Sequence, residues 1–313
     1  MSLAIHDVKQ RLRGVAVGLL TPFDDSSEIE YGKIEENAGS LYDSGVKTFL
    51  TSANISEYDS LSQSERVNVT ERSVNALPSD ACVLAGVGGS TGDAKDLIRE
   101  YDRIGVDAMM IMPPHHTYIH ERGLLDYYEG LASATDTPFV PYVRGFDPSV
   151  EYLAGLTRLD SVVGIKYALE DAVKLGMGID AGDDDVVWVD GLAEPYALSY
   201  WAEGARGFSA GVSNFRPEVG LELYDALSNG NWDRARRLRN ICMPYQNFRD
   251  RAGQDNTIPG AVSIPAVKRG LDLAGLYGGD NVRAPLRPLA PEEAELTAEL
   301  YDQLDDDIDE LVA

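Results

Sequence analysis

Lysine and cysteine are scarce in this chain of 313 residues, and long apolar runs are absent. Seven lysines stand against twenty arginines, and the two cysteines, Cys82 and Cys242, lie far apart in the sequence. They form no disulfide framework and no spaced metal-ligand pattern, so they fit a reducing compartment. No stretch of about 18 apolar residues and no signal-peptide core is found. We therefore expect a cytoplasmic, soluble protein with no membrane partner.

Acidic side chains dominate the charge. The formal net charge is −25 and the sequence pI is near 4.4, with acidic residues spread along the chain and denser only over 305–310. Such a surface repels phosphates, so no nucleic acid partner is expected. Dispersed acid with few lysines favours a cytosol at very high salt, as in a halophile, where screening weakens the self-repulsion. An ordinary acidic enzyme is the alternative.

Apolar runs alternate with amphipathic stretches eight times between residues 14 and 228. This alternation predicts a parallel sheet, and eight units in that length match an α/β fold, the (β/α)8 TIM barrel. An open doubly wound sheet would need a glycine-rich phosphate loop after its first strand, but Thr21-Pro22-Phe23 follows there. The expected strands are 14–20, 46–51, 82–86, 108–112, 138–142, 162–166, 186–190 and 207–210; the expected helices are 31–43, 63–77, 92–104, 122–134, 148–156, 170–179, 194–202 and 217–228.

Only helical patterns follow the eighth unit. Amphipathic stretches over 232–251, 264–276 and 291–311 predict three further helices. We expect residues 1–228 to form the barrel and residues 229–313 a C-terminal helical extension packed on it. A separate C-terminal domain is the alternative, but it would be small for an independent core.

Lys166 ends the buried apolar run that begins at Val162. A lysine rarely ends a buried strand, because its ammonium group loses hydration there. Burial lowers a lysine pKa, and the free amine that results can attack a carbonyl carbon. The sequence therefore makes Lys166 a candidate for forming a Schiff base. The alternative is a lysine whose amine reaches out to the rim of the sheet.

The carboxyl ends of barrel strands meet at one face, where active sites of this fold lie. Tyr142 follows the fifth strand and Lys166 the sixth, so a phenol and an amine can lie side by side. The amine can form an imine and the phenol can transfer protons. Other residues expected at this face are Thr21, Asn54, Ile55, Ser56, Glu57, His115, His116, Arg144, Asp190, Gly191, Ser209 and Gly211.

Ordered motifs from about Gly14 to Leu289 resemble the dihydrodipicolinate synthase / N-acetylneuraminate lyase family of class I aldolases. The motifs are Leu20-Thr21-Pro22-Phe23, Glu57-Tyr58, Leu61-Ser62, Glu65-Arg66, Pro113 with Gly123, Pro138 to Tyr142, Val163-Gly164-Ile165-Lys166, Ile264-Pro265 with Lys268, and Pro285 to Leu289. The resemblance implies that pyruvate or another 2-oxo acid forms an imine on Lys166, with Tyr142 as the proton-relay phenol. It implies no cofactor and a homotetramer or homodimer.

The loop that binds the substrate carboxylate in the family departs from its pattern here. The family has Gly-Thr-Thr-Gly-Glu, whereas this chain has Ala53-Asn54-Ile55-Ser56-Glu57. Ile55 can still donate its backbone N–H and Asn54 its amide, but an amide cannot shuttle a proton as a threonine hydroxyl does. Ser56 is a weaker candidate ligand, with plain solvation of the loop as its alternative.

The loop after the fourth strand is rich in histidine. The family often places a neighbouring subunit's tyrosine here, and His115 could replace that phenol as an acid or base. A metal site of His115, His116 and His120 would need a further ligand, and none is evident. The alternative is that these histidines lie in a solvated loop and have no role in the chemistry.

Substrate choice follows from the residues around Tyr142. Lysine-pathway members of the family carry an arginine five residues after the tyrosine, but this chain has Asp147 there. An aspartate repels a carboxylate, so condensation with aspartate semialdehyde is disfavoured, although Arg144 lies nearer the tyrosine and is a candidate to act instead. With Gly191 and Ser209 as further substrate-binding candidates, we expect cleavage or dehydration of a 2-oxo-3-deoxy sugar acid.

Three alternatives stay open. The first is dihydrodipicolinate synthase activity in lysine biosynthesis. The second is a non-catalytic paralogue that binds a small acid. The third is a phosphate-binding barrel, for which the stretch from Gly207 to Gly211 is a partial match.

Overall fold

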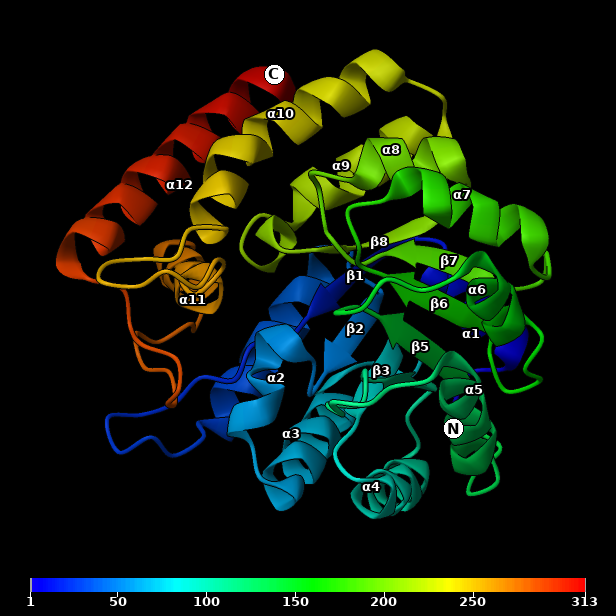
Figure 1. The fold of residues 1–313 in the computed structure, drawn as a ribbon. Helices are drawn as coiled ribbons and strands as arrows, with labels where there is room; N and C mark the ends of the chain where they lie inside the picture. Colours follow the sequence, from blue (N-terminus) through cyan, green and yellow to red (C-terminus); the bar gives the residue numbers. More distant parts are fainter. Residues whose placement is uncertain (1, 313) are drawn as a thin grey trace.

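The computed structural model describes residues 2–312, in which eight parallel strands close into a barrel (Figure 1). The strands pair in chain order, and β8 pairs with β1. The predicted (β/α)8 barrel is therefore confirmed. The strands are β1 (Val15–Gly18), β2 (Thr48–Thr51), β3 (Cys82–Val87), β4 (Ala108–Ile111), β5 (Phe139–Val143), β6 (Gly164–Tyr167), β7 (Val187–Asp190) and β8 (Gly207–Ala210).

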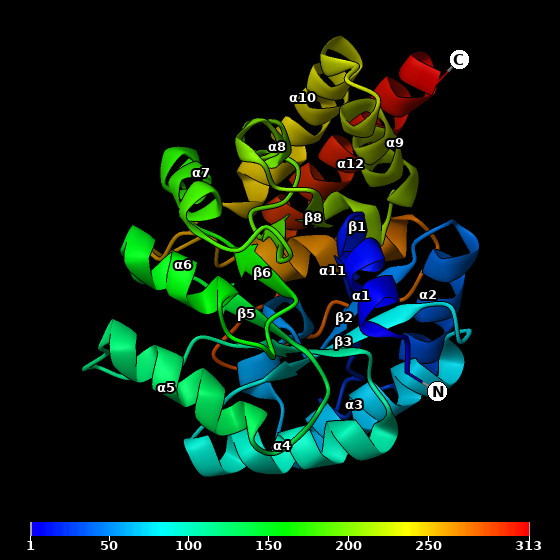
Figure 2. The ribbon, with the colours of Figure 1, turned by 90° about the vertical axis from the view of Figure 1, so that its right-hand side faces the viewer.

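A helix follows each strand and packs on the outside of the barrel (Figures 1 and 2). The predicted cap of α3 is present, because Ser62 Oγ accepts from the Glu65 N–H at 3.3 Å and Glu65 Oε2 accepts from the Ser62 N–H at 2.8 Å. The barrel helices are α2 (Tyr31–Asp43), α3 (Gln63–Ala76), α4 (Thr91–Ile104), α5 (Glu121–Ala132), α6 (Val150–Thr157), α7 (Ala172–Ala181), α8 (Ala197–Glu203) and α9 (Pro217–Ser228).

Helix α1 (Ile5–Leu12) is not among the elements predicted from the sequence. It buries Val8 and Leu12 against the apolar interior of the barrel. Leu12 reaches the start of β6, where a Cβ on Gly164 would lie 2.8 Å from Leu12 Cδ1. Helix α1 therefore covers the amino ends of the strands and leaves the carboxyl ends as the open face.

Three further helices, α10 (Trp232–Arg249), α11 (Ser263–Leu273) and α12 (Pro291–Val312), follow the barrel. Helices α10 and α12 lie side by side and antiparallel, and α10 packs against α9 (Figures 1 and 2). Their apolar side chains form one core with residues from the barrel, among them Leu20 and Phe215. Among the described residues, no helix combines the length and apolar character needed to cross a membrane.

A buried ion pair ties this extension to the loop after β2. Lys268 Nζ of α11 lies 2.6 Å from Glu57 Oε1, and the two side chains are 1% and 0% exposed. Glu57 has a φ of +60° and also accepts a hydrogen bond from the Arg283 N–H at 3.0 Å. The extension thereby helps to hold the loop that carries Asn54 and Ile55.

Candidate active site

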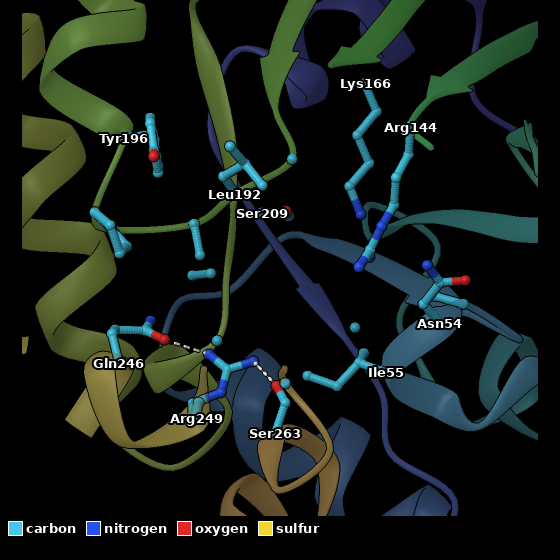
Figure 3. A pocket seen from close by; sticks show the side chains of 18 of the residues that line it. Asn54, Ile55, Arg144, Lys166, Leu192, Tyr196, Ser209, Gln246, Arg249 and Ser263 are labelled. Carbon is cyan, nitrogen blue, oxygen red and sulfur yellow. Dashed lines mark hydrogen bonds between the residues drawn. The ribbon is translucent and has the colours of Figure 1, made fainter. Parts of the chain in front are cut away.

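A cavity of about 370 Å³ opens at the carboxyl ends of the strands. Seven of the nine candidate site residues line it, and Figure 3 shows Lys166 and Arg144 pointing into it side by side. The seven are Asn54, Ile55, Tyr142, Arg144, Lys166, Gly191 and Ser209.

Lys166 lies beside Tyr142 across neighbouring strands. The two residues are partners in the β5–β6 register, and Lys166 Nζ lies 4.5 Å from the centre of the Tyr142 ring. Burial lowers the pKa of Lys166, the nearby Tyr142 opposes this shift, and the Arg144 guanidinium adds to it. The site thus favours the free amine that nucleophilic attack requires.

The other lysines have different surroundings. Five of the seven form ion pairs with carboxylates, including Lys268 with Glu57. Lys95 lies half-buried on α4 and does not line the cavity. Within residues 2–312, Lys166 alone is buried in a cavity without a carboxylate within 4 Å of its amine.

Arg144 connects to the phenol of Tyr142. Its Nη1 donates a hydrogen bond to Tyr142 Oη at 3.2 Å. The guanidinium therefore holds a positive charge beside both the phenol and the lysine amine. A positive charge here also suits an anionic substrate.

The loop after β2 forms a short 3₁₀ helix over Asn54–Ser56. Its first hydrogen bond is donated by the Ser56 N–H, so the N–H groups of Asn54 and Ile55 are not used by this turn. Gly18 makes room for Ile55, because a Cβ there would lie 2.4 Å from Ile55 Cγ2. Asn54 and Ile55 thus line the cavity while their N–H groups are not used by the turn.

Ser56 does not lie where the sequence analysis expected a ligand. It is fully buried, its Oγ donates to the Leu19 carbonyl and accepts from the Ala53 N–H, and it is not part of the cavity wall. The solvated-loop alternative is equally wrong for this residue. The hydroxyl instead ties the loop to Leu19, which follows β1.

Gly191 and Ser209 lie at the wall formed by β7 and β8. A Cβ on Gly191 would lie 3.2 Å from Lys166 Cγ and 2.7 Å from Ala168 Cβ, so glycine leaves room for the lysine. Ser209 Oγ donates to the Asp190 carbonyl oxygen at 3.2 Å. The Asp190 carboxyl is buried outside the cavity wall, and burial raises its pKa.

His115 lies outside the cavity. It is exposed in the loop after β4 and lines an adjoining depression that shares Asn54 and Arg144 with the cavity. His116 Nδ1 accepts from the Tyr118 N–H, and His120 caps α5 through the Arg122 N–H. No cluster of three potential metal-binding His, Cys, Asp or Glu side chains occurs in the described part of the chain.

Asp147 also lies outside the cavity. Its side chain is 84% exposed and pairs with Lys174 of α7. Its carboxylate therefore does not face a substrate directly, in contrast to the repulsion expected from the sequence. The arginine that the resemblance leads one to expect at this position is still missing.

In a comparison with protein-family models, the chain matches the dihydrodipicolinate synthetase family over residues 11–304. The chain belongs to this family. Among its relatives is a "probable 5-dehydro-4-deoxyglucarate dehydratase" of Bacillus subtilis, 28% identical over 289 residues that cover 89% of this chain and 91% of the relative. A 4-hydroxy-tetrahydrodipicolinate synthase of Methanothrix thermoacetophila is 29% identical, covering 93% and 96%.

Solved structures of the family share the fold. A dihydrodipicolinate synthase from Oceanobacillus iheyensis superposes with a TM-score of 0.90 at 26% identity, covering 97% of this chain and all of the other. The match spans the C-terminal helices as well as the barrel. The resemblance read from the sequence motifs is thereby confirmed.

The sequence analysis missed the residues that the extension brings to the cavity. Gln246 and Arg249 come from α10 and Ser263 from α11, and all three line the wall opposite Lys166 (Figure 3). Tyr196 and Glu170 line it from the loops after β7 and β6. The amphipathic pattern of residues 232–251 carried no signal for Arg249, because its approach to the cavity depends on how α10 packs.

Proposed function

We propose that this family member is a Schiff-base-forming lyase that acts on a 2-oxo-3-deoxy sugar acid. The observation that carries the proposal is the unpaired, buried amine of Lys166 beside Tyr142 in a cavity at the open face of the barrel. The lowered pKa supplies the free amine, and the neighbouring phenol supplies a proton donor and acceptor.

The first step joins Lys166 to the ketone. The Nζ lone pair attacks the C2 carbonyl carbon, the carbonyl oxygen takes a proton, and loss of water from the carbinolamine gives the imine. Tyr142 can donate and recover the protons in this sequence, since its ring centre lies 4.5 Å from the amine. Arg144 holds that hydroxyl through its hydrogen bond at 3.2 Å.

Two outcomes can follow from the imine. Loss of a C3 proton gives an enamine, whose electron pair can expel the C4 hydroxyl, which takes a proton and leaves as water. Alternatively, removal of the C4 hydroxyl proton breaks the C3–C4 bond, and the electron pair stays on the enamine as an aldehyde leaves. The lysine carries the electron pair in both cases, so the same residues serve dehydration and cleavage.

The substrate carboxylate is proposed to bind at Asn54 and Ile55. Their N–H groups are not used by the turn, and charge-assisted hydrogen bonds from N–H groups stabilise a carboxylate. Ser209, Tyr196 and Ser263 add hydroxyls to the wall, which suits a hydroxylated chain. Relatives named as probable 5-dehydro-4-deoxyglucarate dehydratases favour the same substrate class.

Turnover assays test this function against its alternatives. We expect the protein to cleave or dehydrate a 2-oxo-3-deoxy sugar acid, and Lys166→Ala to abolish this while Lys95→Ala, at a lysine outside the cavity, leaves it unchanged. Formation of the cyclic lysine precursor from pyruvate and aspartate semialdehyde instead would favour the 4-hydroxy-tetrahydrodipicolinate synthase alternative. Binding without any turnover would favour the non-catalytic paralogue.

We further propose a salt-rich cytoplasm and a homotetramer or homodimer as the working state. The net charge of −25 supports the first, because salt screens repulsion within an acidic protein. For the second, Val173 and Met177 are 66% and 54% exposed, one turn apart on α7. Sedimentation at several salt concentrations measures both the association and its dependence on salt.

A further inference from the structure

Arg249 lies across the cavity from Lys166. It is the last residue of α10, so the C-terminal extension, not the barrel, brings it to the site. In Figure 3 its guanidinium lies at one side of the cavity and the Lys166 amine at the other. The cavity therefore has an arginine on each of two sides, Arg144 beside Lys166 and Arg249 opposite.

Neutral groups hold the Arg249 guanidinium in place. Its Nη1 donates to Gln246 Oε1 at 2.6 Å and its Nη2 donates to Ser263 Oγ at 3.1 Å (Figure 3). Gly211 gives it room, because a Cβ there would lie 1.9 Å from Nη1. The guanidinium is thus a fixed part of the wall.

Among the described residues the Arg249 guanidinium forms no direct ion pair, although the Glu194 carboxylate, which Gln246 bridges to it, and the adjacent Asp250 favour its charge. Within residues 2–312 no carboxylate lies within 4 Å of it, and its Nε is buried without a hydrogen-bond partner. Burial lowers the pKa of Arg249, although the guanidinium keeps its charge at neutral pH. Unpaired cations that line a cavity are suited to an anionic ligand group.

The position of the Glu194 carboxylate limits which anion can bind near Arg249. Its carboxylate accepts from the Gly211 N–H at 3.4 Å and the Val212 N–H at 3.1 Å, and from Gln246 Nε2. These are the backbone donors after β8 that a phosphate would need in a phosphate-binding barrel. Because an acidic side chain already occupies them, a bulky dianion is disfavoured and a single carboxylate at Arg249 is favoured.

We propose that Arg249 binds the distal carboxylate of a six-carbon keto diacid while Lys166 forms the imine with its ketone. The proposal rests on the function proposed above and narrows its substrate from sugar acids in general to those with an acid at both ends. Asn54 and Ile55 bind the carboxylate next to the ketone, and Arg249 the remote one. Arg249 is then a specificity-determining residue.

Turnover of three matched substrates tests this. They are a 4-deoxy-5-oxo aldarate, the 3-deoxy-2-oxo aldonate with a terminal hydroxymethyl group, and its 6-phosphate. We expect kcat/KM to be highest for the diacid and lowest for the phosphate. Arg249→Met should lower kcat/KM for the diacid about 10- to 100-fold, mainly through KM, and for the monoacid less than about threefold.

Gly211→Ala and Arg237→Met serve as the companion variants. A Cβ at Gly211 displaces the guanidinium, so Gly211→Ala should also reduce the preference for the diacid. Arg237 is exposed on α10, the helix that carries Arg249. Arg237→Met should leave kcat/KM unchanged for both the diacid and the monoacid. Equal losses for diacid and monoacid in Arg249→Met, or a preference for the phosphate, would overturn the proposal.

A binding measurement tests the role of Arg249 separately from the proposed lyase reaction. In Lys166→Ala, which cannot form an imine, calorimetry should still show tighter binding of the diacid than of the monoacid, and Arg249→Met should remove the difference. Equal affinities would overturn the role of Arg249 even if the wild-type protein is a lyase. Conversely, selective diacid binding without turnover would refute the lyase and leave Arg249 as the distal anion site.

Discussion

Tyr142 and Lys166 face each other as register partners on β5 and β6, with Lys166 Nζ 4.5 Å from the centre of the phenol ring. Adjacent parallel strands place both side chains on the inner face at the same height. The pairing is therefore a consequence of the barrel itself and not of a flexible loop. It brings a proton donor to the amine before any substrate binds.

Removal of the Tyr142 hydroxyl should separate imine formation from turnover. We expect Tyr142→Phe to lower kcat on the order of 10²–10⁴, because proton transfer by a positioned group is lost. Lys166 keeps its surroundings, so reductive trapping of pyruvate should persist in this variant. Steady-state kinetics and mass spectrometry measure the two effects, and an unchanged kcat would remove Tyr142 from the mechanism.

The pH dependence of imine formation should move when Arg144 is replaced. Burial, with the help of the Arg144 charge, lowers the pKa of Lys166, and the fraction of free amine rises as the pH rises through that pKa. Arg144→Met removes a charge that disfavours the ammonium, so the pKa should rise. The rate of trapping at neutral pH should fall and the profile should shift to higher pH.

A profile that stays in place, or shifts to lower pH, would contradict this account. Arg122→Met is a matched control, because Arg122 is exposed on α5 and does not line the cavity. Its profile should coincide with that of the unchanged protein.

The fold was predictable where a local pattern decides the structure. Helices α2 and α9 begin and end at the predicted residues, since Gly45 follows the first and Pro217 opens the second. Short apolar runs predicted the strands, because both faces of a parallel barrel strand are buried. Helix α1 was missed although Val8 and Leu12 have helical spacing.

The site was predictable only in part. Lys166 and Tyr142 lie at strand ends, so the barrel topology places them once the strands are known. Arg249 was missed because its position depends on the packing of α10 against the barrel. Ser56 and His115 do not line the cavity, because loop residues follow turn geometry, which turns the serine inward and leaves the histidine exposed.

The Lys268–Glu57 pair should be essential for stability. Both side chains are buried, so Lys268→Met leaves an uncompensated carboxylate and should lower the free energy of unfolding by about 3–5 kcal/mol. Denaturant unfolding measures this loss. The double variant Lys268→Met with Glu57→Gln should recover part of the stability, and a loss under about 1 kcal/mol in the single variant would refute the role of the pair.

Salt should stabilise the protein. Because the net charge is −25, repulsion within the folded chain weakens as the ionic strength rises. We expect the Tm to rise by several degrees between dilute buffer and molar KCl in calorimetry at neutral pH. A Tm that is constant or falls with KCl would argue against a protein adapted to high salt.

The most direct test of the central claim is borohydride reduction in the presence of pyruvate, followed by peptide mass spectrometry. We expect one adduct, on Lys166, and none in Lys166→Ala. An adduct on Lys268 or Lys47, or no adduct in the unchanged protein, would contradict the assignment of Lys166 as the imine-forming residue.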